Sequence, residues 1–262
     1  MSRVVHGFDL SGLVILITGG YGHLGKACVD SLVHHGANVY VLARSSEKFL
    51  QAFPDCDDIA VTFFSCDISK TSDLKYAFKS IFQKEGKIDV LINNAFYCKG
   101  TCPETLSDSE WSIGIEGVVG SAFRAMREVI PFFKGQNNGR IINISSIYGL
   151  RSPDFNIYKN FPLHRNPPHY GAAKAALLQL TKYYACILGP HGITVNALTP
   201  GAFPSSDVHK DVGFIKELES KTALNRVGRP EDLAGGVIFL SSSAGNYITG
   251  QNIIIDGGWT AK

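Results

Sequence analysis

The chain has 262 residues, of which 45% are hydrophobic and 18% charged, and this composition excludes an intrinsically disordered protein. A chain of this length fits one large α/β domain, which buries enough apolar surface to fold without a disulfide or metal site. The formal net charge is only +2 and there is no basic block, so nucleic acid is not an expected partner.

Short apolar segments rich in Val and Ile alternate with longer amphipathic segments along the chain. This alternation predicts a doubly wound parallel sheet with helices on both faces, because parallel strands need crossover connections. We expect a single α/β domain over residues 1–262. The expected strands are 13–18, 38–43, 59–65, 88–93, 139–145, 192–198 and 252–256. The expected helices lie near 24–35, 70–85, 107–133, 169–188 and 230–242.

The cysteine pattern and the apolar runs indicate an intracellular protein. The six cysteines are scattered without a CxxC pair, which argues against a zinc site and a disulfide framework. Residues 1–12 lack the apolar core of a signal peptide, and no apolar run approaches the ~18–20 residues of a membrane span. We expect a soluble, cytoplasmic protein with neither a metal nor a membrane partner.

A glycine-rich turn follows the first expected strand and begins a helix. Glycines at this place let the backbone approach a pyrophosphate, which the helix N-terminus stabilises. The turn therefore predicts a dinucleotide cofactor. The candidate contacts are Thr18, Gly19, Gly20, Tyr21, Gly22, His23, Leu24 and Gly25.

The same turn resembles the TGxxxGxG motif of the short-chain dehydrogenase/reductase family. Thr18, Gly19 and Gly25 match, while His23 stands where the family has its middle glycine. Either the glycine has moved by one position, to Gly22, or the imidazole faces the cofactor. The resemblance extends over about residues 8–260 and implies a Rossmann-type oxidoreductase that binds a nicotinamide cofactor.

The end of the second expected strand bears on the choice of cofactor. A carboxylate there would bind the ribose hydroxyls and repel a 2′-phosphate. The chain instead has Ala43 followed by Arg44, whose guanidinium suits a phosphate. We predict a preference for NADP(H) over NAD(H), the alternative being that Arg44 is a solvated surface residue.

Three more segments resemble cofactor-binding motifs of the family. Asp67 resembles its adenine-contacting aspartate, although it could equally cap the next helix. The family's Asn-Asn-Ala-Gly appears as Asn93-Asn94-Ala95-Phe96, in which Asn93 chiefly holds the sheet together, and Pro200-Gly201 resembles a motif beside the nicotinamide. The contacts implied by these segments are Asp67, Ile68, Asn94, Ala95, Pro200, Gly201 and Ser205.

Tyr170 and Lys174 provide the sharpest chemical signal. They lie four residues apart on an expected helix, so they share one face, where a cation and the helix N-terminus favour the phenolate. The resemblance implies a catalytic triad of Ser146, Tyr170 and Lys174. Tyr170 would transfer the hydroxyl proton, Ser146 would orient the carbonyl oxygen, and Lys174 would lower the tyrosine pKa and hold the nicotinamide ribose.

One residue of the family's site is missing. Family members have an asparagine in the helix after the fourth strand that supports a water relay to the lysine, and Gly117 stands there in this chain. A water molecule could replace the amide, Glu116 could participate, or the proton relay could be impaired.

A long irregular segment, residues 150–168, separates Ser146 from Tyr170 and makes this spacing longer than is usual in the family. Its charged residues Arg151, Lys159, His164 and Arg165 favour a polar, even anionic, substrate, the alternative being a solvated loop that touches nothing. Residues 203–226 are expected to form a substrate lid. The candidate substrate contacts are Phe96, Tyr148, Arg151, Tyr158 and Phe203.

The expected function is the NADP(H)-dependent interconversion of a ketone and a secondary alcohol on a sugar-like, sugar-nucleotide or hydroxy-acid substrate. The pattern SSIYG…PDFxIY…PPxY is similar to a branch of the family found in flagellin-modification and sialic-acid-type sugar pathways. The alternatives are a 3-oxoacyl thioester (acyl carrier protein) reductase and a catalytically silent NADP(H)-binding regulatory or scaffold protein. The closing segment, residues 248–259, resembles the family's subunit contact, so we expect a homodimer or homotetramer.

Overall fold

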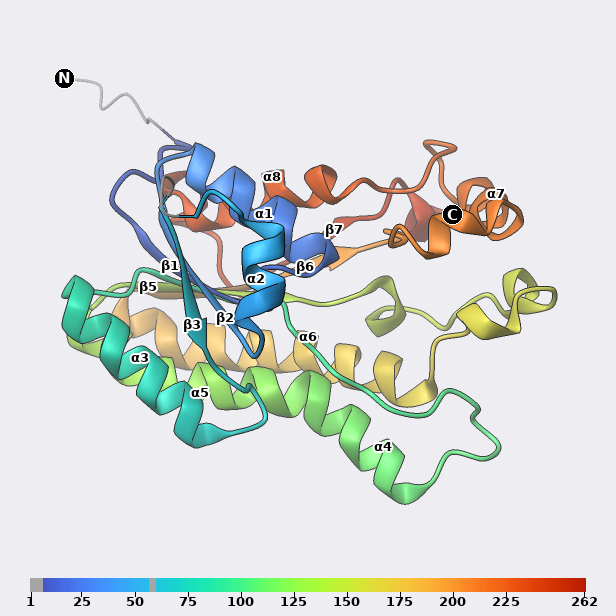
Figure 1. Cartoon of the computed structure of the whole chain (residues 1–262), viewed down its shortest axis with the longest axis horizontal. Coiled ribbons are helices and arrows are strands. Elements are labelled where there is room, and N and C mark those ends of the chain that lie inside the picture. Colours follow the sequence, from blue (N-terminus) through green and yellow to red (C-terminus); the bar gives the residue numbers. More distant parts are fainter. Residues whose placement is uncertain (1–6, 57–59) are drawn as a thin grey trace.

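The computed structural model describes residues 7–56 and 60–262. Its seven parallel strands form one sheet in the order β3-β2-β1-β4-β5-β6-β7, so the expected single-domain, doubly wound α/β fold is confirmed (Figure 1). Two predictions fall partly outside the described residues. One is the third expected strand, at residue 59, and the other is the expected absence of a signal peptide, at residues 1–6. The strands are β1 Val14–Thr18, β2 Asn38–Ala43, β3 Val61–Ser65, β4 Val90–Asn93, β5 Gly139–Ile144, β6 Ile193–Pro200 and β7 Asn252–Ile255.

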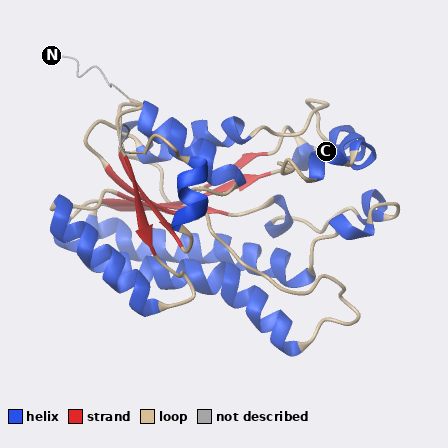
Figure 2. Ribbon diagram, viewed as in Figure 1, coloured by secondary structure: helices blue, strands red, loops and turns tan. Residues whose placement is uncertain are grey.

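Helices cover both faces of the sheet (Figure 2). One face is covered by α1, α2 and α8, and the other by α3, α5 and α6. The helices are α1 His23–His34, α2 Ser46–Ala52, α3 Thr71–Glu85, α4 Asp108–Ile115, α5 Ser121–Gln136, α6 Pro168–Leu188, α7 Val212–Lys221 and α8 Pro230–Ser241. The short helix α2 and the helix α7, inside the expected lid, are additions to the sequence-based expectation.

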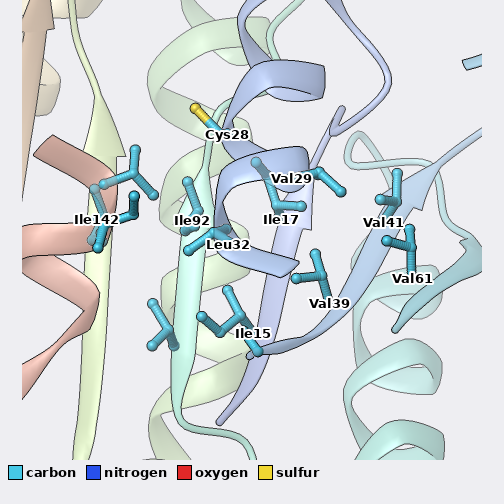
Figure 3. Close-up of a cluster of buried hydrophobic side chains, with 14 of the residues drawn as sticks. Ile15, Ile17, Cys28, Val29, Leu32, Val39, Val41, Val61, Ile92 and Ile142 are labelled. Atoms are coloured by element: carbon cyan, nitrogen blue, oxygen red, sulfur yellow. The ribbon is translucent and has the colours of Figure 1, made fainter. Parts of the chain in front are cut away.

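The apolar strand sequences explain this arrangement. Alternate residues of β1 point to opposite faces, so Ile15 and Ile17 join the cluster under α1, while Val14 and Leu16 join the cluster under α3 and α5. Figure 3 shows the first cluster, in which Val29 and Leu32 of α1 pack against side chains of β1 and β2. Because both faces are buried, the strands need no polar alternation.

The long helix expected over residues 107–133 is interrupted. The chain forms α4, then one π-helical turn over Glu116–Gly120, and then α5. At this turn the segment after β4 lies against the helix, and the Tyr97 N–H donates to the Gly117 carbonyl at 3.3 Å. Such π-turns inside α-helices occur frequently at functional sites.

Residues 150–168 and 203–226 project together beyond the carboxyl ends of the strands, at the right of Figure 1. The first segment contains two short 3-10 turns, Phe155–Tyr158 and Pro162–His164, and the second contains α7. An aromatic cluster joins them, because Phe214 of α7 packs against Tyr158 and Phe161. In the part of the chain that the structure describes, no helix is long and apolar enough to cross a membrane.

Candidate active site

A cleft of about 830 Å³ lies at the carboxyl ends of the strands. It is lined by residues that follow β1, β2, β3, β4, β5 and β6. Strand β1 pairs with β2 on one side and β4 on the other. Strands β2 and β3 therefore extend the sheet on one side of β1, and β4 to β7 extend it on the other side. Ligands of doubly wound sheets bind at such a switch point.

The glycine turn forms the floor of the cleft next to α1. An ideal Cβ on Gly25 would lie 2.5 Å from the Gly19 carbonyl oxygen, so only glycine allows this close approach of turn and helix. Asn94, the residue after β4, holds the turn in place, because its amide donates to the carbonyls of Thr18 at 3.0 Å and Gly19 at 3.1 Å. The α1 N-terminus has no side-chain cap, which leaves its N–H groups available to an anion.

Most of the predicted cofactor contacts line this cleft. Thr18 and Gly20 do not: the Thr18 hydroxyl accepts from the backbone of Asn94 and Ala95, and Gly20 packs against Ile17. Ser205 does not line it either. The predicted residues that do line it are Gly19, Tyr21, Gly22, His23, Leu24, Gly25, Arg44, Asp67, Ile68, Asn94, Ala95, Tyr170, Lys174, Pro200 and Gly201.

The structure gives His23 and Asp67 definite partners. His23 begins α1 and hydrogen bonds to the Pro204 backbone at the start of the expected lid, while burial and the nearby His209 lower its pKa. Asp67 accepts from the Ser69 N–H at 3.0 Å in a local turn, and α3 begins beyond it, so Asp67 is not the helix cap. Arg44 is exposed at the same end of the cleft.

Ser146, Tyr170 and Lys174 come together at the other end of the cleft. Tyr170 lies in the first turn of α6, and Lys174 follows one turn later on the same face. The Tyr170 hydroxyl hydrogen bonds to the Ser146 side chain, and the Lys174 Nζ donates to the Ile144 carbonyl at 2.6 Å. The Ser145 hydroxyl donates to the Lys174 carbonyl at 3.1 Å, which ties β5 to α6 behind the site.

Burial controls the protonation of this cluster. Burial raises the pKa of Tyr170 to about 12, although its hydrogen bond to Ser146 opposes the shift. Burial also lowers the pKa of Lys174 to about 7. Tyr170 is therefore a neutral phenol at neutral pH, in contrast to the lowered tyrosine pKa that the Tyr-Lys spacing suggests.

Phe96 occupies the place of a small residue in the family motif, and its ring covers the cluster. The Lys174 Nζ lies 5.2 Å from the centroid of the Phe96 ring, and the rings of Phe96 and Tyr170 are 5.3 Å apart. Because half of its surface is exposed to the cleft, Phe96 forms a wall beside the candidate reacting groups.

The backbone of another segment fills the space beside Gly117, the position at which the family has an asparagine side chain. The Tyr97 carbonyl oxygen occupies the position of an ideal Cβ on Gly117, so a side chain cannot fit there. Glu116 faces away and forms an ion pair with Arg124 at 2.6 Å. Its carboxylate is thus engaged outside the cluster, which argues against the participation of Glu116.

A second cavity of about 380 Å³ lies on the far side of Ser146 and Tyr170. Ser146, Tyr170, Gly201 and Phe203 line both cavities. Of the predicted substrate contacts, Phe203 therefore borders both, Phe96 lines the first, and Tyr148 and Tyr158 line the second. The fifth, Arg151, lines neither, because its guanidinium donates to the Trp259 carbonyl at 3.3 Å.

Several residues that line the second cavity were missed by sequence reasoning. Leu163 and Asn166 come from the 150–168 segment, and Phe214 and Leu218 come from α7. His164, already named from the sequence among the charged residues of that segment, lines the cavity as well. The alternation of apolar and charged residues over 212–221 is the signal that could have predicted an amphipathic helix there. Their convergence depends on how two segments, distant in sequence, pack.

Comparison with known proteins agrees with this architecture. A family model described as enoyl-(acyl carrier protein) reductase matches residues 22–260. The chain is 31% identical over 265 residues to the rhamnolipids biosynthesis 3-oxoacyl-(acyl-carrier-protein) reductase of Pseudomonas aeruginosa, covering 96% of this chain and 98% of that protein. The chain belongs to the short-chain dehydrogenase/reductase family.

Solved structures of the short-chain dehydrogenase/reductase family superpose on nearly the whole chain. A short-chain dehydrogenase from Leptospira borgpetersenii with bound NAD+ has a TM-score of 0.85 at 32% identity, with 99% of this chain and 96% of that chain covered. A gluconate 5-dehydrogenase from Burkholderia cenocepacia in complex with NADP and tartrate has a TM-score of 0.87 at 26% identity, with 99% and 100% covered. The protein is an oxidoreductase of this family, acting on CH–OH or keto groups.

Proposed function

We propose that this protein is an NADP(H)-dependent reductase that converts a ketone of a polar substrate into a secondary alcohol. One observation carries the proposal: Ser146 and Tyr170 border both the large cleft and the second cavity. A cofactor in the first cavity and a ketone in the second would meet at these two hydroxyl groups. This arrangement suits a transfer reaction between two bound molecules.

The residues of the cleft fit a nicotinamide dinucleotide. The close contact of Gly19 and Gly25 leaves the turn free of side chains where a pyrophosphate would approach, and the uncapped α1 N-terminus would stabilise its charge. Arg44, exposed at the cleft's end, supports the choice of NADP(H), because its guanidinium suits the 2′-phosphate. When bound, the cofactor supplies the hydride.

The protein side chains supply orientation and a proton. The Ser146 hydroxyl, which hydrogen bonds to Tyr170, is proposed to orient the carbonyl oxygen of the substrate. The Tyr170 phenol would give its proton to that oxygen as negative charge develops on it. Lys174 is proposed to hold the nicotinamide ribose and to stabilise the phenolate that remains.

The protonation of Tyr170 supports reduction as the favoured direction. A pKa of about 12 keeps the phenol protonated at neutral pH, which is the form that donates a proton to a ketone. Oxidation of an alcohol needs the phenolate instead, and forming it in this buried place is costly. The proposed cofactor, NADP(H), would also favour reduction of the ketone in a cell.

A sugar-like, sugar-nucleotide or hydroxy-acid substrate is proposed for the second cavity. Two of the tyrosines that line it, Tyr148 and Tyr158, belong to the pattern that is similar to the sugar-pathway branch of the family. The likeness to a gluconate 5-dehydrogenase with bound tartrate supports the same class.

Reduction of a 3-oxoacyl thioester is the second candidate. It is favoured by the match to the 3-oxoacyl-(acyl-carrier-protein) reductase of Pseudomonas aeruginosa, which extends over nearly the whole of both chains. Activity on an acyl thioester, with none on keto-sugars, would favour this candidate.

The proposed function is tested by following NADPH and NADH oxidation with keto-sugars, sugar nucleotides, keto acids and a 3-oxoacyl thioester. We expect turnover with NADPH and one of the polar ketones, and a loss of about 10³-fold in Tyr170→Phe, which lacks the proton donor. Tyr76→Phe, which removes an exposed hydroxyl of α3 away from both cavities, is the control. Equal rates in wild type and Tyr170→Phe would overturn the proposal.

We also propose a homodimer or homotetramer in the cytoplasm. Phe123 of α5, and Tyr183 and Ile187 of α6, are large side chains exposed on helices that cover the same face of the sheet. A second copy covering them would remove apolar surface from water. All six cysteines are free, which supports a reducing compartment.

A further inference from the structure

The second cavity is lined in part by polar side chains, most of which carry no formal charge. Within the described chain, its lining includes no Lys, Arg, Asp or Glu. Its polar groups beyond Ser146 and Tyr170 are two phenols, an imidazole and an amide, supplied by Tyr148, Tyr158, His164 and Asn166. Such groups bind hydroxyl and carbonyl groups, and they leave a substrate charge unbalanced.

The two phenols form one hydrogen-bonded pair. The hydroxyl groups of Tyr148 and Tyr158 hydrogen bond to each other, and burial raises the pKa of Tyr148, which therefore stays a neutral phenol at neutral pH. The bond between them uses one of the two O–H groups, so the pair can donate one hydrogen bond to a hydroxyl group of a ligand and can also accept from it.

Two pairs of ionisable side chains join the surrounding segments. Asp154 forms an ion pair with Lys221 at 2.7 Å, and His164 pairs with Asp211 at 3.1 Å. These contacts join the 150–168 segment to the two ends of α7. The carboxylates of Asp154 and Asp211 and the amine of Lys221 are thus engaged outside the cavity lining.

Among the described residues that line the cavity, His164 is the one whose side chain becomes a cation when protonated. Its Nε2 faces Asp211, and its ring stacks on Phe214 with centroids 4.3 Å apart. A substrate carboxylate would have to compete with the Asp211 carboxylate for this imidazole. The stacked ring instead offers an apolar face to a ligand.

The shape of the cavity limits its occupant. A volume of about 380 Å³ lies near the lower end of the roughly 300–1,000 Å³ range of ligand sites. This space suits one substituted ring and is small for a nucleotide. The aromatic side chains of Phe203 and Phe214, which line it, favour an apolar face on that ring.

On the basis of the proposed reductase function, we propose that the second cavity binds the uncharged ring of a hydroxylated cyclic ketone and discriminates against a carboxylate, phosphate or amine on that ring. Tyr148, Tyr158 and Asn166 are its specificity-determining residues. This narrows the three substrate classes of the proposed function to a neutral, sugar-like ring. It excludes a hydroxy acid whose carboxylate enters the cavity, and it leaves the ionic portion of a sugar nucleotide outside.

The test uses cyclic ketones of one skeleton: 4-hydroxycyclohexanone, methyl 4-oxocyclohexanecarboxylate, 4-oxocyclohexanecarboxylate and 4-aminocyclohexanone. Their Kd values for the wild-type protein saturated with NADP+ are measured by ligand-observed NMR at pH 7. We expect the alcohol and the ester to bind at least about 30-fold more tightly than the carboxylate and the ammonium compound, because a buried charge would stay unpaired. Equal or tighter binding of either ion would overturn the inference, as would the absence of binding by the alcohol and the ester.

A designed change of selectivity gives a second readout. Asn166→Arg places a cation in the lining, and we expect it to shift the ester-to-carboxylate Kd ratio at least about tenfold towards the carboxylate. The control Asn166→Gln keeps the amide and should keep the wild-type ratio. Val208→Lys, at another position of the lining, provides the same test if Asn166→Arg fails to fold. An unchanged ratio in a folded variant would count against the inference.

The binding experiment separates this inference from the proposed function. NADPH oxidation is measured with the same four compounds. Neutral-selective binding without any turnover would refute the reductase activity and leave the selectivity of the cavity intact. Turnover with carboxylate-selective binding would refute the inference and support the activity.

Discussion

The carbonyl oxygen of Tyr97 fills the position that a side chain on Gly117 would need. The Tyr97 N–H also donates to the Gly117 carbonyl, which in turn accepts from the Ser121 hydroxyl at 2.9 Å. The absence of a side chain at position 117 is thus tied to the path of the segment after β4. Phe96 precedes Tyr97 in this segment, and Gly117 belongs to the π-turn against which the segment lies.

Gly117→Ala is expected to destabilise the protein by about 3 kcal/mol, because the added methyl group overlaps the Tyr97 backbone and forces the segment away. Urea unfolding followed by circular dichroism measures this difference. Gly135→Ala in α5 is the control, since nothing lies within 4 Å of its Cβ position, and we expect it to be neutral or to stabilise by ~0.5–1 kcal/mol. Similar effects of the two substitutions would contradict the close packing at Gly117.

Lys174→Met is expected to change how stability depends on pH. The folded protein holds the pKa of Lys174 at about 7, below its ordinary value, so the unfolded chain binds more protons between pH 7 and pH 10. The free energy of unfolding of the wild type should therefore rise relative to Lys174→Met by about 1.4 kcal/mol per pH unit in this range. Below pH 7 the amine is charged in both states and the difference should be constant.

Urea unfolding at pH 6, 7, 8 and 9 measures this slope in the absence of a cofactor. Lys182→Met, which changes an exposed lysine of α6, is the control and should run parallel to the wild type. A wild-type curve parallel to that of Lys174→Met throughout would show that the amine is not desolvated.

Arg44→Ala is expected to raise the Kd of NADPH about 30-fold, because a charge-assisted contact with the proposed 2′-phosphate is lost. The Kd of NADH should change by less than about threefold, since no phosphate is present. Fluorescence titration of both cofactors measures the two values. Lys48→Ala, an exposed cation of the neighbouring helix α2, controls for general electrostatic attraction. Equal losses for both cofactors would refute the NADP(H) preference.

Phe214→Ala is expected to loosen the contact between the 150–168 segment and α7. Its ring packs against Tyr158, Phe161 and His164, so its removal deletes the centre of this cluster. We expect the KM of the ketone to rise at least about tenfold through lost positioning. The Kd of NADPH should not change, because Phe214 does not line the larger cleft.

Val212→Ala, at an exposed position of the same helix, is the matched control for this experiment. Limited proteolysis provides a second readout, and we expect faster cleavage within residues 150–168 in Phe214→Ala only. An unchanged KM would mean that the two segments do not form the substrate site.

Local signals were sufficient to predict most of the sheet and much of the cleft. The Val- and Ile-rich runs correspond to β1 to β7 within a few residues at each described end, because strands buried on both faces need continuous apolar sequence. Asn93 was expected to hold the sheet together, and its amide donates to the Asn143 side chain at 2.8 Å. The contact of Arg151 with substrate, by contrast, was predicted from charge alone, and its side chain points elsewhere.

The order of strands and helices, the glycine turn before α1, and the one-turn spacing of Tyr170 and Lys174 follow from local sequence, because each depends on residues close together in the chain. The protonation of these two groups follows from the fold, since desolvation depends on what the rest of the chain packs around them. The fold also brings the Tyr97 backbone beside Gly117 and pairs Asp154 with Lys221 and His164 with Asp211. These contacts join segments that are far apart in sequence, and no local pattern encodes their meeting.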